Sequence, residues 1–224
     1  MVAIFVLVLF LFILLVDLIV LQIQGKSHPA FEPTLSQYDY PVYDGNVIPI
    51  PSNLFFSKGH TWLKRNKDGL IEIGIDPFGT TALGTLLIQK CVKSGKELKR
   101  GEVILEGSYG NKTIKFLSPV NGIVKSINSD IFGKNISNPY KAWGVRLISN
   151  DSLENGDLFF AGSEALNWMK KEFIKLKGFI DDRSAKVELV GETMYDGGLL
   201  SNDAVALLVD QSVNDFEKEF LSLK

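Results

Sequence analysis

The sequence contains a single cysteine, Cys91, and only two histidines, His28 and His60, among its 224 residues. One cysteine cannot form an intrachain disulfide, so the fold has to be held together by packing. One cysteine and two histidines far apart also supply too few ligands for a structural zinc site or an iron–sulfur cluster. The sequence therefore predicts no metal site.

The sequence has no large excess of charge of either sign, because its 24 Lys and Arg nearly balance its 26 Asp and Glu and leave a net charge of −2. Nucleic-acid-binding proteins are usually strongly basic, so we expect no nucleic-acid partner. The sequence also lacks a phosphate-binding glycine loop, paired zinc ligands and a nucleophile elbow. We therefore predict that the chain is not an enzyme and has no catalytic residues.

Polar side chains are missing from the N-terminal end. Residues 1–16 contain none, and Asp17 is followed by four more apolar residues. About 20 such residues in a helix cross a hydrocarbon layer of roughly 30 Å. A cleaved signal peptide would need a basic residue before the run and small residues at a cleavage site, and neither is present. The sequence predicts that residues 1–24 are a transmembrane anchor and that the membrane is a partner.

Residues 25–53 contain five of the eight prolines and no apolar period, which is typical of an extended tether. Lys26 is the only basic residue near the anchor and lies on its C-terminal side. By the positive-inside tendency, this favours a single-pass N-terminal anchor with the body of the protein on the cytoplasmic side.

The next segment, about residues 54–150, consists of short apolar runs separated by Gly, Asn and Pro, a pattern that predicts a compact mainly-β domain. The predicted strand runs are Leu70–Ile75, Leu83–Ile88, Val103–Leu105, Gly122–Ile127 and Gly144–Ile148. We expect Trp62 and Trp143 to fill the core of this domain. His60 is expected to be a partly buried histidine whose hydrogen bonds are satisfied.

Helical periodicity replaces this pattern in residues 151–224, which we predict to be a small α-rich appendix. One apolar stripe starts at Leu166, with Ser163 as the expected N-cap, and a second stripe includes Val213, Phe216 and Phe220. Residues 58–177 hold 19 basic and 12 acidic side chains, whereas residues 181–224 hold 4 basic and 10 acidic ones. Lysines at 170–177 could therefore face anionic lipid headgroups or pair with the acidic tail.

Six short motifs follow one another in the β segment: Phe56–Trp62, Ile73–Gly79, Ala82–Gly84, Ser94–Glu102, Ser118–Gly122 and Asn138–Tyr140 with Trp143–Gly144. In order and spacing they resemble the glycine cleavage system H-protein family over about residues 54–150. The resemblance implies a barrel-sandwich hybrid, the fold of lipoyl and biotinyl carrier domains. It also implies protein partners that are oxidoreductase components.

In that family a protruding β-hairpin presents one lysine that carries an amide-linked lipoyl group. Counting back from Pro119 places Asn111 at this position, and counting forward from Glu106 places Tyr109 there. Lys112 is the only lysine in the tip segment 108–113, so it is the candidate for lipoate attachment. Lys115 is expected to lie against the wall of the domain.

Two functions remain open at this stage. The first is a membrane-anchored, H-protein-like carrier or binding module, with or without a lipoyl arm on Lys112, whose partners are redox enzymes. The second is a structural adaptor of a membrane complex that uses the same fold without modification. The anchor, the tether and the appendix count against the free carrier of the glycine cleavage system itself.

Overall fold

The computed structural model describes residues 42–43, 46–84, 86–109, 112–136, 138–184, 194–195, 199–200 and 210–224. The chain divides into two units, Met1–Tyr40 and Pro41–Lys224, and the described residues all belong to the second. The predicted anchor therefore lies outside the described residues. Among those residues, no helix combines the length and the apolar character needed to cross a membrane.

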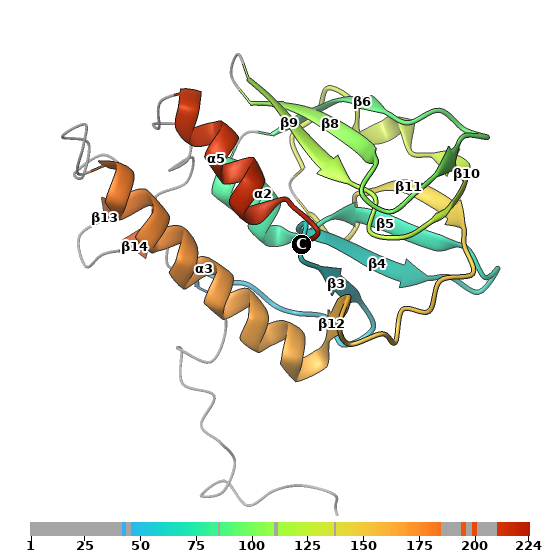
Figure 1. The fold of residues 1–224 in the computed structure, drawn as a ribbon, viewed down its shortest axis with the longest axis horizontal. Helices are drawn as coiled ribbons and strands as arrows, with labels where there is room; N and C mark the ends of the chain where they lie inside the picture. The colour runs from blue at the N-terminus through green and yellow to red at the C-terminus, as the bar shows by residue number, and fades with distance from the viewer. Residues whose placement is uncertain are drawn as a thin grey trace, which may run out of the picture. The chain divides into compact units, whose positions relative to one another are not determined.

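Two sheets form the body of this unit (Figure 1). The larger has the strand order β12-β3-β4-β5-β11-β10-β7, and the smaller has the order β6-β8-β9. The strands of the larger sheet are β3 (Phe55–Ser57), β4 (Thr61–Arg65), β5 (Ile71–Ile75), β7 (Glu97–Leu98), β10 (Gly122–Ile127), β11 (Trp143–Ile148) and β12 (Phe159–Ala161). Those of the smaller sheet are β6 (Leu87–Cys91), β8 (Val103–Tyr109) and β9 (Lys112–Leu117).

Helices and short pairs complete the described structure. The helices are α2 (Pro77–Leu83), the 3-10 turn η1 (Ser129–Ile131), α3 (Gly162–Ser184) and α5 (Asp210–Phe220). Two-residue strands pair as β1 (Val42–Tyr43) with β2 (Asn46–Val47), and as β13 (Met194–Tyr195) with β14 (Leu199–Leu200). The expected mainly-β sandwich with helices in its C-terminal part is confirmed.

Alternation along the strands supplies the core. Ile71 and Ile73 of β5 are fully buried, as are Ile114 and Phe116 of β9. The neighbouring residues Thr113 and Lys115 of β9 are exposed. Side chains of a strand alternate between its two faces, so β9 places every second residue in the core, whereas β4 and β5 also have successive buried residues. The sequence runs at β5 and β10 are confirmed, because the structure has strands at Ile71–Ile75 and Gly122–Ile127.

The two tryptophans expected in the core differ. Trp62 is 2% exposed, and its ring lies over Gly74 on the neighbouring strand so closely that a Cβ there would be 2.5 Å from it. Trp143 is half-buried and packs against the core from its margin, so it contacts the core but does not fill it as expected. The Arg146 guanidinium covers its ring at 4.0 Å, and Arg146 also binds Glu72 at 2.8 Å. The ring of Trp143 thus combines packing against the core with a cation–π contact.

The run Leu83–Ile88, expected as a strand, is divided between two elements. Leu83 ends α2, whereas β6 begins at Leu87. Helix α2 begins after Asp76, whose side chain accepts a hydrogen bond from the Gly79 amide, and Pro77 occupies the first helical turn. This is a normal helix start, since Asp is a strong N-cap and Pro is favoured directly after it.

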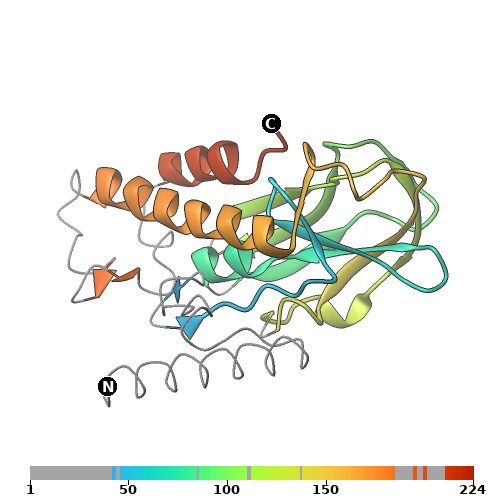
Figure 2. The same cartoon turned by 90° about the horizontal axis from the view of Figure 1, so that it is seen from below.

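Helices α3 and α5 lie side by side in both views (Figures 1 and 2), joined by ion pairs between Lys175 and Glu219 and between Arg183 and Asp215. The acidic C-terminal segment therefore pairs with the helix that contains the lysines at 170–177, which was one of the two alternatives for these lysines. Helix α3 starts at Gly162, so Ser163 is inside its first turn and is not the N-cap. Aromatic rings fill the space between α2, α3 and α5: Phe78, Phe173, Phe179, Phe216 and Phe220.

Candidate functional site

The hairpin formed by β8 and β9 is the element on which the candidate lysine lies. The two strands are antiparallel, and their last pair is Tyr109 with Lys112. Only positions 110 and 111 separate these strands, so the hairpin has a two-residue loop, of which Gly and Asn are typical components. Asn111, one of the two positions obtained by counting along the sequence, lies in this loop and outside the described residues.

Lys112 lies on the strand, not in the loop. Its side chain lies on the same face of β9 as those of Ile114 and Phe116, which point into the core, and it is half-buried. Lys115 lies on the opposite face of β9 and is exposed, so the expectation that it lies against the wall of the domain is wrong. The hairpin therefore places one lysine beside its loop on the inner face and one farther along on the outer face.

A second cluster surrounds His60, which lies in the turn between β3 and β4. The residue has a φ of 54°, and its side chain is completely buried, not partly buried as expected. The ring is stacked between Phe78, at 3.8 Å, and Trp168 of α3, at 5.0 Å. His60 thus fills a gap between α2 and α3.

Two carboxylates flank the His60 ring. Its Nδ1 atom lies 2.9 Å from Oδ2 of Asp76, which is also fully buried, and its Nε2 atom lies 3.6 Å from Oε2 of Glu172 on α3. Nε2 is buried and has no hydrogen-bond partner among the described residues, so the expectation of satisfied hydrogen bonds holds for one ring nitrogen only. Burial alone lowers the pKa of His60, but the charge and hydrogen bond of Asp76, together with the nearby Glu172 carboxylate, outweigh it and raise the pKa above 6.5.

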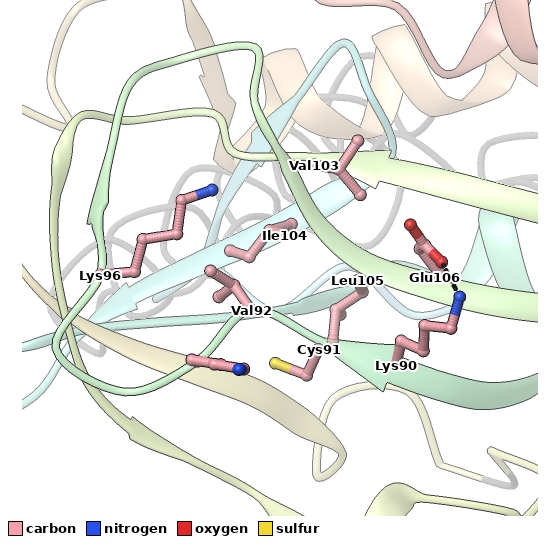
Figure 3. A pocket seen from close by; sticks show the side chains of 9 residues that line it. Lys90, Cys91, Val92, Lys96, Val103, Ile104, Leu105 and Glu106 are labelled. Carbon is pink, nitrogen blue, oxygen red and sulfur yellow. Dashed lines mark hydrogen bonds and ion pairs between the residues drawn. The ribbon is translucent and has the colours of Figure 1, made fainter.

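The single cysteine lies in a surface depression of about 340 Å³ at the edge strand β6 (Figure 3). Val92, Ile104 and Leu105 surround the thiol, and Lys90 and Lys96 lie at the margin. Burial raises the pKa of Cys91 to about 12, although a hydrogen bond from the Val92 backbone opposes the shift. Because the thiolate is the reactive form, this depression is not a site for nucleophilic chemistry at neutral pH.

The structure brings few of these groups together. Within the part of the chain that it describes, no three His, Cys, Asp or Glu side chains are arranged to hold a metal ion. Sequence reasoning singled out Lys112 and His60 but missed Asp76 and Glu172. Asp76 could have been found from the sequence, because an Asp followed by Pro is typical of a helix start. Glu172 could not, because it is more than a hundred residues from His60 and no local pattern connects the two.

Two sheets of seven and three strands, with a hairpin that has a two-residue loop, place the described domain in the class of mainly-β sandwich proteins. The sequence model of the family described as glycine cleavage H-protein matches residues 54–172 of this chain. The chain belongs to the glycine cleavage H-protein family. The match extends beyond the expected limit at residue 150 into the first half of α3.

Individual relatives agree with this assignment. A probable glycine cleavage system H protein of Pyrococcus abyssi (strain GE5 / Orsay) is 30% identical over 105 residues, which cover 46% of this chain and 78% of the relative. The glycine cleavage system H protein of Mycobacterium avium (strain 104) is 30% identical over 84 residues, 38% of this chain and 64% of the relative. A solved H protein from Mycobacterium marinum has 22% identity and a TM-score of 0.45, covering 53% of this chain and 98% of that one.

Proposed function

We propose that the chain is an H-protein-like carrier or binding module that is not itself catalytic and whose working element is the β8–β9 hairpin. Membership of the family over residues 54–172, together with a two-residue hairpin next to a lysine, supports this proposal. A short loop at the end of two paired strands holds a side chain away from the domain while restricting its motion.

The group that such a module would carry is lipoate on Lys112. A primary amine beside the loop fits amide attachment, which needs only a lysine that a modifying enzyme can reach. The half-buried place of Lys112 on the inner face of β9 does not fit a group that has to project. When bound, a lipoyl group supplies a disulfide that accepts electrons and carries an acyl or aminomethyl fragment. The protein supplies the tether, which keeps the group at high effective concentration near its partners.

We further propose that residues 1–24 anchor the module in a membrane, with residues 25–53 as the tether and the body on the cytoplasmic side. The uninterrupted apolar run and the position of Lys26 support this arrangement. The partners would then be oxidoreductase components held at the same membrane, because two molecules confined to one surface meet more often than two in solution.

A second function follows from the placement of Lys112. If its amine stays on the inner face, the hairpin binds a partner without any prosthetic group, and the chain is a structural adaptor of a membrane complex. The inner-face position of Lys112 and the Asn at position 111 favour this alternative.

Co-expression with a lipoate ligase, followed by intact-mass measurement and peptide mapping, distinguishes the two functions. A carrier gains one lipoyl group, and Lys112→Arg abolishes the gain while the matched variant Lys115→Arg retains it. An adaptor gains none. The variant Asn111→Lys tests the register of the hairpin, because a lysine at this loop position should be modified even if Lys112 is not.

The anchor is tested separately. Full-length protein expressed in bacteria should remain in the membrane pellet after washing with alkaline carbonate, and its N-terminal peptide should be recovered intact. Release into the supernatant, or an N-terminus that starts beyond Gly25, would contradict the anchor without affecting the assignment of the hairpin.

A further inference from the structure

The C-terminal segment Asp210–Lys224, which comprises α5 and the four residues after it, lies outside the stretch that matches the family. It nevertheless contacts that domain. Phe216 and Phe220 pack on Phe78 of α2, and further contacts reach the strand β9, the turn between β7 and β8 and the turn between β3 and β4. The segment is therefore an addition to the family fold, and α5 contacts β9 of the hairpin (Figure 1).

The first contact is made to the backbone of β9. Oε1 of Glu217 accepts a hydrogen bond of 2.7 Å from the Lys115 amide. β9 is the last strand in the order β6-β8-β9, so this amide faces away from β8 on the free edge of the sheet. Such edge amides are the groups to which another chain can add a strand. Glu217 thus occupies a pairing site of the hairpin.

The second and third contacts are made by the last residues of the chain. The Leu223 carbonyl accepts a hydrogen bond of 3.3 Å from Nη2 of Arg100 in the β7–β8 turn. At Gly59, in the β3–β4 turn, a Cβ would lie 3.0 Å from Cδ2 of Leu223 and 3.2 Å from the Leu221 carbonyl. The absence of a side chain at Gly59 therefore makes room for the tail.

Apolar packing is the main interaction that holds this segment. Four apolar side chains are buried, those of Val213, Phe216, Phe220 and Leu221. The ion pairs with α3 are partly exposed, and such pairs contribute little and weaken as salt is added. Nη1 of Arg100 is buried without a hydrogen-bond partner among the described residues, and release of the tail would let water reach it. Opening of this terminal segment exposes less apolar surface than unfolding of the whole domain, so it requires less free energy.

We propose that residues 210–224 are a displaceable cover over the free edge of β9, and that a partner protein which adds a strand to this edge has to displace α5. This proposal rests on the proposed function in one respect, which is that partners contact the β8–β9 hairpin. With α5 in place, the backbone amide of Lys115 is occupied by Glu217 and cannot pair with a partner strand. With α5 released, the edge presents its amides to the backbone carbonyls of a partner strand.

Hydrogen–deuterium exchange of the full-length protein tests whether the cover opens by itself. The amides of α5 and of Lys115 should exchange together, and faster than those of β10 and β11. Phe216→Ala removes a buried anchor and should speed exchange at Lys115 by about tenfold or more, whereas Asn214→Ala, on the exposed face of the same helix, should leave it unchanged. Val124→Ala, in the core of β10, should speed exchange in all strands equally.

The proposal is overturned if α5 exchanges only together with β10 and β11, or if Phe216→Ala does not speed exchange at Lys115. A lipoate ligase then serves as a protein that has to approach the hairpin. If Lys112 is a substrate, Phe216→Ala should be modified several-fold faster than the wild type and Asn214→Ala at the wild-type rate, and equal rates in all three would also overturn the cover. If no variant is modified, the lipoyl part of the proposed function fails, and the exchange experiment alone decides the cover.

Discussion

His60 and Glu172 form a buried link between the turn before β4 and the helix α3, with Nε2 of the imidazole 3.6 Å from Oε2 of the carboxylate. Nδ1 of the same ring is held by Asp76, the N-cap of α2, at 2.9 Å. Protonated His60 therefore lies between two negative charges from two different helices. If the ring loses its proton, the lone pair of Nε2 faces the Glu172 carboxylate, and the link becomes a repulsion.

We expect the stability of the protein to depend on pH through this ring. The folded-state pKa of His60 is raised above 6.5, so the stabilisation is fully present below about pH 6.5 and is lost as pH rises through the folded pKa. Urea denaturation between pH 6 and 9 should show a falling free energy of unfolding, and the imidazole resonances of His60 should titrate above pH 6.5. A free energy that rises over this range would contradict the assignment. Asp76 and Glu172 are the charged groups that face the ring, and Tyr140 lies near Asp76 with its own pKa raised mainly by burial.

Glu172→Gln should weaken the link to α3. We expect a loss of about 1–3 kcal/mol in the free energy of unfolding at pH 6, because the negative charge that faces a buried imidazolium is removed. The loss should shrink as pH rises past the pKa of His60. Glu164→Gln, in the exposed first turn of the same helix, is the matched control and should change the free energy little. Equal losses at pH 6 and 9 would show that Glu172 acts without His60.

Gly74→Ala should destabilise the domain by about 1–3 kcal/mol, because the added methyl group would overlap the ring of Trp62 at 2.5 Å. Gly178 is the contrasting position, since it lies exposed in α3 with no atom within 4 Å of an added Cβ. Gly178→Ala should stabilise the protein by about 0.5–1 kcal/mol through lower backbone entropy in the unfolded chain. Thermal denaturation of the two variants measures both effects, and a neutral Gly74→Ala would refute the close packing of Trp62.

Cys91 should be nearly inert at neutral pH. A pKa of about 12, against an ordinary value of 9.0, leaves about a thousandfold less thiolate at pH 7. Alkylation by iodoacetamide should therefore be about a hundredfold or more slower in the folded protein than in the same protein unfolded in urea. Comparable rates in the two states would mean that the thiol is not buried as the structure has it.

The sequence located some of the strands but not the contacts between elements. Gly122–Ile127 was predicted with the limits of β10, because a strand between clear turn residues has a local signature. Leu83–Ile88 was read as one strand, because a short apolar run does not distinguish the end of a helix from the start of a strand. Trp143 looked like a core residue, yet it is Arg146, three residues farther along the same strand, that lies over its ring.

The candidate site was predictable to a similar extent. The turn residues at 110–111 indicated where the hairpin reverses, and the pairing of Tyr109 with Lys112 agrees with it. The face on which Lys112 lies depends on strand parity, which a shift of one residue reverses, so counting from flanking motifs could not settle it. The cover formed by α5 has no local signal at all, since Glu217 and Lys115 are far apart in the chain.

The outermost pairing of the large sheet has a consequence for how the chain is made. β3 is the first strand of the family domain and pairs with β12, its last, so that Phe56 lies opposite Phe160. During synthesis β3 therefore emerges long before its partner, and only the hairpin pairing with β4 is available to it in the meantime. Contacts that close so long a loop form late and slow the folding of β proteins. The ribosome has to release residues up to Ala161 before this sheet can be completed. Between the synthesis of β3 and that of β12, the nascent chain has an unpaired strand edge and therefore most need of a chaperone.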